Sequence, residues 1–348
     1  MNESIEKLIK KANEGFADAE CQLGCCYALG DGVPQSDIKA LYYFESSAKK
    51  GNPFAQFKLA KYYFDGIAVK KDDEKAFELF SEAATAIDEA YYNLGVCYLN
   101  GIGVNANFEK AAECFLKLPE NADSLNVLGT MYQKGQSIMQ NYEKAVALYN
   151  KAAKLGSADA VFNLALCYRA GEGVEQNDEK AFELFKKAAD FGIDKASYYL
   201  GKAYENGLGV KADCSLAVKH YKLAAEFGIL KATVALAECY LNGVGVEHSD
   251  EKAFELYKRA SEYPEAMRMI SFCYENGLGV RQDDEEAFEW LVKAAKAGDA
   301  MSQYNLAESY RTGVGAPKDA DLAKYWYRRA ARQGDVDSIE ALETFFAE

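Results

Sequence analysis

The sequence predicts an all-α protein of the α-solenoid type, in which one helix–turn–helix unit occurs nine times in 348 residues. Three observations support this prediction. A leucine or isoleucine recurs at intervals of 34 to 36 residues, small residues and a tyrosine stand at constant offsets around it, and a glycine and a helix-capping residue follow at constant distances. We number each repeat from this residue, position 0, which is Leu23, Leu59, Leu94, Leu128, Leu164, Leu200, Leu236, Ile270 and Leu306.

The residues around position 0 predict the first helix of each repeat. Position −4 is always alanine or serine, position +1 is glycine, alanine or serine, and position +4 is always tyrosine. These offsets lie on one stripe of a helix with 3.6 residues per turn. We therefore expect a first helix whose small residues allow another backbone to approach closely, while leucine and tyrosine fill the core.

A glycine at position +7 of every repeat predicts the end of the first helix. The stretch NGIGV at 100–104 is one example, and it also resembles the first half of a G-x-G phosphate-binding loop. Similar stretches recur along the chain, however, and no strand-like alternation or third glycine accompanies this one. We interpret Gly101 as a helix C-cap in the left-handed conformation. Ala68 and Ser137 replace the second glycine, at position +9, in two repeats, which a turn tolerates better than a phosphate loop does.

A second helix is predicted from position +13 onward. Position +17 is always alanine, and position +21 is phenylalanine, tyrosine or, once, Leu291. The capping side chains at position +13 are Ser36, Asp72, Asn107, Asn141, Asn177, Asp213, Ser249, Asp283 and Asp319. Because positions 0 and +17 keep the same spacing in every repeat, we expect a rigid unit, with all length variation in the connectors.

The full pattern, A-x-x-x-L-G-x-x-Y-x-x-G-x-G-V followed by K-A-x-x-x-[FY]-x-x-A-A-x-x-G, resembles the Sel1-like repeat, a relative of the tetratricopeptide repeat. The resemblance covers roughly residues 18–336. It implies a right-handed superhelix of stacked helix pairs that serves as a protein-interaction scaffold or adaptor. The predicted domains are an N-terminal cap helix at 1–17, repeats at 18–53, 54–88, 89–122, 123–158, 159–194, 195–230, 231–264, 265–300 and 301–336, and a C-terminal cap helix at 337–348.

Composition and charge narrow the choice of partner and compartment. The net charge of −14 and the pI near 4.9 would repel nucleic acid and attract a basic protein surface. No run of about 18 apolar residues and no export signal is visible, which predicts a protein that neither spans a membrane nor is exported. The 9 cysteines are an odd number, and five of them directly precede a tyrosine, as expected for buried fillers in a reducing, cytoplasmic compartment.

The sequence predicts no catalytic, cofactor or metal site. His220 and His248 are the only histidines and lie 28 residues apart, so no metal pair or catalytic triad is visible. Paired acids such as Asp72 and Asp73 fall where helix caps belong. Two alternatives to a scaffold stay open: an inhibitor or immunity-type protein dedicated to one effector, and a weak β-lactamase-like hydrolase, an activity credited to some members of a cysteine-rich secreted branch of the family.

The predicted binding surface is the side of the first helices opposite the leucine and tyrosine stripe, at offsets −5, −2, −1, +2 and +5. Position −2 is aromatic in five repeats and position −1 is asparagine in three, a lining suited to an extended peptide. The alternative is that the rings only pack between neighbouring first helices. The candidate partner-binding residues are Phe57, Lys61, Tyr92, Asn93, Phe162, Asn163, Arg169, Tyr198, Lys202, Glu238, Tyr304, Asn305, Glu308 and Arg311.

Overall fold

The computed structural model describes residues 3–136 and 139–346, and within these ranges the chain forms twenty helices and no strand. The fold is an α-solenoid of helix pairs, as predicted. The first helices of the nine repeats are α2 (Ala17–Leu29), α4 (Pro53–Asp65), α6 (Asp88–Asn100), α8 (Ala122–Lys134), α10 (Ala158–Ala170), α12 (Asp194–Asn206), α14 (Leu230–Asn242), α16 (Pro264–Asn276) and α18 (Ala300–Thr312). The second helices are α3 (Asp37–Lys49), α5 (Asp73–Ala83), α7 (Phe108–Leu116), α9 (Tyr142–Lys154), α11 (Asp178–Asp190), α13 (Cys214–Glu226), α15 (Asp250–Arg259), α17 (Asp284–Ala297) and α19 (Ala320–Ala331).

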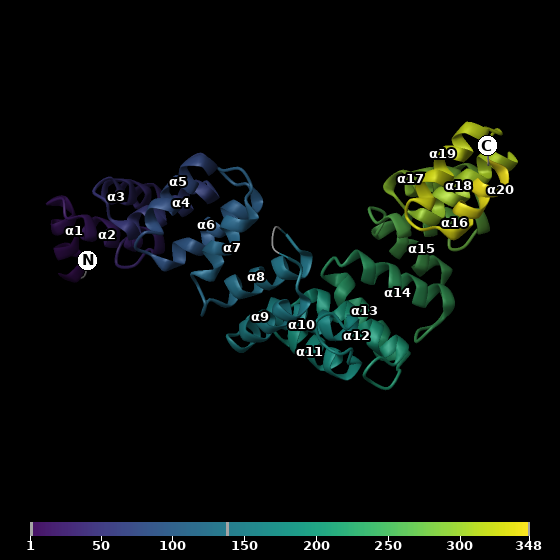
Figure 1. The fold of residues 1–348 in the computed structure, drawn as a ribbon, viewed down its shortest axis with the longest axis horizontal. Coiled ribbons are helices and arrows are strands. Elements are labelled where there is room, and N and C mark those ends of the chain that lie inside the picture. Colours follow the sequence, from purple (N-terminus) through teal and green to yellow (C-terminus); the bar gives the residue numbers. More distant parts are fainter. Residues whose placement is uncertain (1–2, 137–138, 347–348) are drawn as a thin grey trace. The chain divides into compact units, whose positions relative to one another are not determined.

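Two further helices stand before and after the pairs, α1 (Glu3–Asn13) and α20 (Val336–Phe345). The chain forms two compact units, Met1–Gln176 and Asn177–Glu348. Within each unit, every helix packs on the next one along the chain, so that helices of one repeat and of adjacent repeats alternate in contact (Figure 1).

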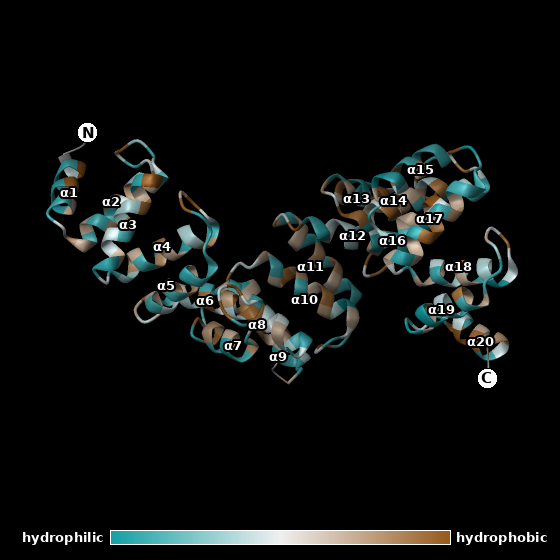
Figure 2. Ribbon diagram, turned by 90° about the horizontal axis from the view of Figure 1, so that it is seen from above, coloured by the Kyte–Doolittle hydropathy of each residue, from teal (hydrophilic) through white to brown (hydrophobic). Residues whose placement is uncertain are grey.

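Apolar and polar residues are interleaved along the helices, as the hydropathy colouring in Figure 2 shows. Each helix therefore has one face for the core and another for solvent. In the part of the chain that the structure describes, no helix has the length and apolar character needed to cross a bilayer.

The core is built around the side chain at position +21 of the second helices. Seven of the largest fully buried side chains occupy this position: Phe44, Phe80, Phe115, Tyr149, Tyr221, Tyr257 and Tyr327. In the four repeats with glycine at position +1, the ring lies directly against that glycine, which explains why the residue is small. A Cβ added to Gly95 would lie 2.8 Å from the Phe115 ring, and one added to Gly129 would lie 2.7 Å from the Tyr149 ring.

The tyrosines at position +4 were expected to fill the core, and this expectation is wrong for most of them. Tyr63 is buried, but the other eight are only half-buried. In five repeats a lysine of the second helix lies over the ring, as Lys110 does over the half-buried Tyr98 and Lys75 over the buried Tyr63, at 5.3 and 4.3 Å from the ring centre. These rings thus cover the edge of the core and offer one face to a cation.

The helix ends are confirmed as predicted. All nine glycines at position +7 adopt the left-handed conformation as C-caps. All nine side chains at position +13 accept a hydrogen bond from a backbone N–H in the first turn of the second helix. The capping residue also donates its own N–H to the carbonyl of the +4 tyrosine, as Asn107 does to Tyr98 at 2.8 Å. NGIGV is therefore a helix-ending turn.

The second glycine of the turn has a role that the sequence did not predict. A Cβ on Gly103 would overlap the carbonyl of Asp73, the first residue of the second helix in the preceding repeat. The same close approach joins Gly173 to Tyr142 and Gly209 to Asp178. The glycine is thus a joint between repeats. Ala68, which replaces it in the second repeat, has a positive φ of 55°, and Ser137 lies outside the described residues.

Replacing Gly103 by alanine is expected to destabilise the protein more than replacing Gly101 does. Both residues have a positive φ, 67° and 69°, which costs about 1 kcal/mol for a residue with a Cβ. At Gly103 the new methyl group also overlaps the Asp73 carbonyl, and the repacking adds about 1–3 kcal/mol. The measurement is the urea midpoint followed by circular dichroism.

Gly51→Ala is the matched control, because Gly51 has a φ of 81° and open space where the Cβ would be. Gly51→Ala and Gly101→Ala should shift the midpoint by similar amounts. A Gly103→Ala shift no larger than theirs would contradict a joint at this glycine.

Candidate partner-binding surface

The candidate residues lie on the first helices of both units. Those of the first unit are Phe57 and Lys61 on α4, Tyr92 and Asn93 on α6, and Phe162, Asn163 and Arg169 on α10. Those of the second unit are Tyr198 and Lys202 on α12, Glu238 on α14, and Tyr304, Asn305, Glu308 and Arg311 on α18. We call the row of first-helix positions −5, −2, −1, +2 and +5 within one unit its first-helix surface.

The aromatic rings at position −2 are half-buried rather than free. Each lies beside the core ring of its own second helix, 23 residues later. The ring centres are 6.0 Å apart for Phe57 and Phe80, 5.9 Å for Tyr92 and Phe115, 6.1 Å for Tyr198 and Tyr221, and 6.0 Å for Tyr304 and Tyr327. Phe162 occupies the same position on α10 and is also half-buried. These rings therefore help to close the core of a repeat, and a contact with a partner through their outer edges stays a prediction.

The asparagines at position −1 differ in what their amides do. The Asn163 amide donates to Asn126 Oδ1 at 2.9 Å, so it links two neighbouring first helices of the first unit. Asn93 donates to the Glu89 carbonyl of its own helix at 3.4 Å. Asn305 is exposed. Only in the last case does the amide stand open to solvent, where a peptide backbone could bond to it.

In three repeats the core tyrosine reaches the first-helix surface with its hydroxyl group. Tyr221 donates to Glu205 Oε2 at 2.9 Å, and the same oxygen accepts from Lys202 Nζ at 2.8 Å. Tyr149 donates to Gln133 Oε1 at 2.8 Å and lies 3.1 Å from the Thr130 hydroxyl. Burial raises the pKa of Tyr149 to about 12, so the hydroxyl keeps its proton.

The ninth repeat has the same arrangement with an arginine. Tyr327 donates to Glu308 Oε1, and Arg311 binds that carboxylate through two nitrogens, with Nε 2.9 Å from Oε1 and Nη2 2.5 Å from Oε2. The bonds from Arg311, and then that from Tyr327, hold the pKa of Glu308 below its ordinary value despite partial burial. Tyrosine, carboxylate and cation thus form a triad, and we call this arrangement the tyrosine triad.

Sequence reasoning identified Lys202, Glu308 and Arg311 but missed the tyrosines, because position +21 was taken only as core. A signal was present. Where position +21 is tyrosine, position +2 or +5 of the first helix is charged or polar in all four repeats. A phenol at the end of a buried ring needs such a partner.

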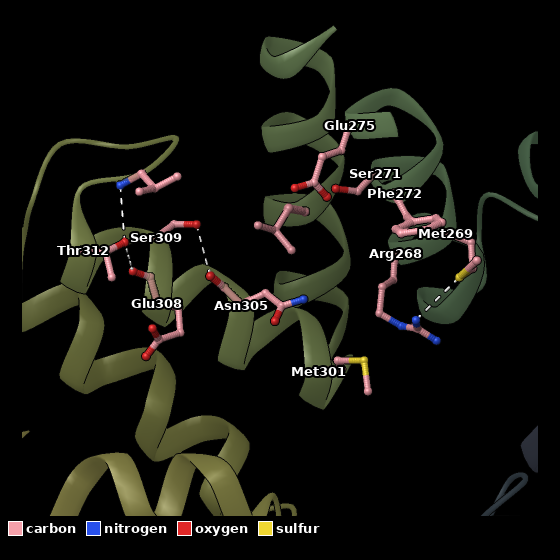
Figure 3. A pocket seen from close by; sticks show the side chains of 12 residues that line it. Arg268, Met269, Ser271, Phe272, Glu275, Met301, Asn305, Glu308, Ser309 and Thr312 are labelled. Atoms are coloured by element: carbon pink, nitrogen blue, oxygen red, sulfur yellow. Dashed lines mark hydrogen bonds between the residues drawn. The ribbon is translucent and has the colours of Figure 1, made fainter. Parts of the chain in front are cut away.

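A groove of about 680 Å³ opens between α16 and α18 in the second unit. This repeat has no ring at position +21, where Leu291 replaces the phenylalanine or tyrosine of the other eight repeats, and none at position −2, where Arg268 replaces the aromatic residue of five repeats. Figure 3 shows the lining side chains, most of which come from these two helices. Leu291 comes from α17, and Val314 from the turn after α18. The lining residues are Arg268, Met269, Ser271, Phe272, Glu275, Leu291, Met301, Asn305, Glu308, Ser309, Thr312 and Val314.

The groove combines exposed apolar side chains with a polar rim. Phe272, Met301 and Val314 are 43, 55 and 74% exposed, and all three lie in the groove. Asn305 and Glu308 are the two predicted residues found there. An apolar floor with a few polar groups is what a side chain of a bound polypeptide requires. Sequence reasoning missed Phe272 and Met301, although both occupy predicted surface offsets, because neither fits the aromatic or amide pattern of the other repeats.

Glu238, on α14, is half-buried. Burial, and then the nearby Glu265, raises the pKa of its carboxyl group above the ordinary value, although Lys202 and Arg268 act in the opposite direction. The environment of Glu238 therefore disfavours its ionised form, whereas the environment of Glu308 favours it.

Histidine and cysteine side chains serve other contacts. The His220 ring stacks on Tyr204 with centres 5.4 Å apart, and burial lowers its pKa. His248 Nε2 lies 3.2 Å from Asp250 Oδ1. All nine cysteines are free, and burial raises the pKa of Cys97, Cys167, Cys239 and Cys273 to about 11, so these thiols are protonated at neutral pH. Among the described residues, no group of three histidine, cysteine or acidic side chains is arranged to hold a metal ion.

Comparison with known proteins agrees with the repeat pattern. The sequence profile of the Sel1 repeat matches nine segments, at residues 17–52, 53–88, 88–118, 122–157, 158–191, 194–227, 230–262, 264–299 and 300–335. A protective antigen present in uropathogenic Escherichia coli strains, which displays an SLR fold, is similar at 32% identity and a TM-score of 0.76, over 97% of this chain and 74% of that chain.

Two other solved structures are similar. A Sel1 repeat protein from Oxalobacter formigenes is 27% identical with a TM-score of 0.63, over 69% of this chain and 96% of that chain. An immunity protein from Pseudomonas aeruginosa is 23% identical over 65% of this chain and 88% of that chain, but its TM-score of 0.44 is too low to support an inference.

Glu238→Gln and Glu308→Gln are expected to change stability in opposite directions at pH 7. The pKa of Glu308 is lowered on folding, so its carboxylate stabilises the protein above the unfolded pKa of about 4.3, and this contribution is lost as pH falls through the folded pKa. The pKa of Glu238 is raised, so its carboxylate costs stability as pH rises from about 4.3 through the folded pKa.

At pH 7, Glu308→Gln should therefore lower the melting temperature and Glu238→Gln should raise it. The difference for Glu238→Gln should vanish as pH falls below about 4.3, where this carboxyl group is protonated in the folded and unfolded states. The difference for Glu308→Gln should persist at that pH and fade only as pH falls through the lowered folded pKa of Glu308. Thermal scans by circular dichroism between pH 3 and 8 make the measurement. A Glu238→Gln variant that is less stable than wild type at pH 7 would refute the assignment for Glu238.

Proposed function

Because the chain belongs to the Sel1 repeat family, we propose that it is a non-enzymatic scaffold that binds a partner protein or an extended peptide through its first-helix surface. Proteins built from this repeat generally mediate protein–protein interactions. The groove between α16 and α18 is the proposed principal contact of the second unit.

The observation that carries the proposal is the composition of this groove. Phe272 and Met301 are both more than two-fifths exposed, yet they lie in one hollow of about 680 Å³. Exposed apolar groups gathered in a hollow and rimmed by polar groups are typical of a protein-interaction site. The triad of Tyr327, Glu308 and Arg311 beside the groove supports a rigid wall, because each member is held by the other two.

Charge supports a protein partner rather than nucleic acid. The net charge is −14, which opposes binding of a phosphate backbone and increases the rate of encounter with a basic surface. Nine free cysteines, six of them buried, support a cytoplasmic location, where thiols stay reduced.

The test is capture of partners from a lysate of the native host, followed by reconstitution with each purified partner. The groove variant combines Phe272→Ala and Met301→Ala. Both side chains are largely exposed, so folding should be unchanged. The matched control is Phe227→Ala, which removes a ring that is 57% exposed and follows the second helix α13.

A partner that binds wild type and Phe227→Ala is expected to bind the groove variant at least tenfold more weakly, as for the loss of about 1.4 kcal/mol from an interface anchor. Equal affinity for all three proteins would contradict the groove as the contact. Recovery of a single partner that binds tightly and is released by salt would instead identify an inhibitor dedicated to one effector.

A further inference from the structure

The seventh repeat contains two of the three members of a tyrosine triad. In the ninth repeat the triad consists of Glu308 at position +2, Arg311 at position +5 and Tyr327 at position +21. The seventh repeat has Glu238 at position +2 and Tyr257 at position +21, but position +5 is Leu241. The carboxylate and the phenol are thus kept at the same offsets, and only the cation is missing.

The Tyr257 hydroxyl group has no hydrogen-bond partner among the described residues, and the side chain is fully buried at 0% exposure. The other three core tyrosines all use this hydroxyl in a hydrogen bond. A buried phenol without a partner costs stability, so it needs an explanation. From position +21 the hydroxyl groups of the other three tyrosines reach position +2 or +5 of the first helix, which places the Tyr257 hydroxyl near Glu238 at position +2. Burial, and then the charge of Glu238, raises the pKa of Tyr257, in agreement with this placement.

The Glu238 carboxylate also has no hydrogen bond or ion pair with any side chain that the structure describes. Two cations lie near it, but each is already paired with other carboxylates. Lys202 Nζ is 2.8 Å from Glu205. Arg268 is at ion-pair distance from two carboxylates, 3.6 Å from Glu265 and 3.5 Å from Asp299, and its buried Nε makes no hydrogen bond with a described residue.

The local charge is therefore negative and unbalanced. Glu205, Glu238, Glu265 and Asp299 provide four carboxylates, whereas Lys202 and Arg268 provide two cations. Tyr198 lies near the same groups, since Lys202 and Glu265 both act on its hydroxyl. The site thus offers a half-buried carboxylate, a phenol without a partner and a nearby aromatic ring, which together fit a guanidinium group.

We propose that an arginine of the bound polypeptide pairs with Glu238 and completes this triad in place of the missing cation. The proposal rests on the proposed function and specifies the partner chemistry for one position of the first-helix surface. Arginine is the fitting residue because Arg311 binds Glu308 through two nitrogens in the intact triad. Once the arginine balances the charge of the Glu238 carboxylate, the Tyr257 hydroxyl donates a hydrogen bond to Glu238, as the Tyr327 hydroxyl does to Glu308.

The test uses a blocked tripeptide, acetyl-glycyl-arginyl-glycine amide, and its citrulline analogue, which keeps the shape of arginine and removes the charge. The protein carries ¹³C at the glutamate carboxyl carbons and the tyrosine ζ carbons. Binding is followed as the chemical shift of Glu238 Cδ and Tyr257 Cζ against peptide concentration at pH 7.

The arginine peptide is expected to shift both signals and to bind about tenfold more tightly than the citrulline peptide, as for one close charge pair. By linkage, a tenfold preference of the arginine peptide for the ionised over the protonated form of Glu238 lowers the apparent pKa of this carboxyl group by about one unit at saturation. Glu238→Gln should abolish the preference for arginine, whereas Glu308→Gln, the matched control in the intact triad, should leave it unchanged.

Tyr257→Phe separates binding from folding. The Tyr257 hydroxyl has no hydrogen-bond partner among the described residues of the free protein, so the melting temperature of this variant should not fall below that of wild type. The variant should nevertheless bind the arginine peptide more weakly than wild type does, because it cannot form the hydrogen bond to Glu238. Equal binding of arginine and citrulline peptides would overturn the proposal. The proposal would also be overturned if the pKa of Glu238 in the free protein were below its ordinary value and rose in the Lys202→Met variant. Lys202 would then already be the partner of this carboxylate.

The outcomes separate this inference from the proposed function. If a captured partner binds the groove variant more weakly than wild type but binds Glu238→Gln as tightly as wild type, the scaffold function is supported and the arginine site is refuted. If the arginine peptide binds at Glu238 but no protein partner depends on the first-helix surface, the arginine site is supported and the proposed scaffold function is refuted.

Discussion

The fold depends on one contact, the packing of the side chain at position +21 of the second helix against the small residue at position +1 of the first helix. Phe115 lies on Gly95 and Tyr149 on Gly129, so closely that a methyl group at either glycine would overlap the ring. This contact sets how near the two helices of a repeat approach. Because it recurs along the chain, it also buries most of the largest side chains in the core.

The same contact controls the surface where a partner is proposed to bind. The +21 side chain crosses the core, and its far end lies at the first-helix surface. A phenylalanine at position +21 makes only an apolar contact there, as the Phe80 ring does with the Phe57 ring. Tyrosine brings a hydroxyl group to a carboxylate or amide, as Tyr221 does at Glu205. Leu291 has no ring, and it lines the groove between α16 and α18. Variation at one core position thus produces three kinds of surface on one backbone.

Contacts between repeats follow a different constraint. The second glycine of the turn lets its backbone touch the start of the preceding second helix, as Gly103 does at Asp73. Here the side chain is absent because another backbone occupies its space, whereas the first glycine is required by its own left-handed conformation. The two glycines of one short turn therefore serve separate levels of structure, the helix end and the stacking of repeats.

The sequence by itself determined the nine repeats, the end of each first helix and the start of each second helix, because C-cap glycines such as Gly101 and caps such as Asn107 act over a few residues. Only the tertiary structure decided which polar atoms meet. Among the described residues it left the Tyr257 hydroxyl without a hydrogen-bond partner, whereas Tyr327 is bonded to Glu308, although Tyr257 and Glu238 have the same spacing as that pair. Helix ends depend on local backbone geometry, which the sequence states directly. Hydrogen bonds and grooves depend on distances of a few tenths of an ångström between separate helices, which packing sets.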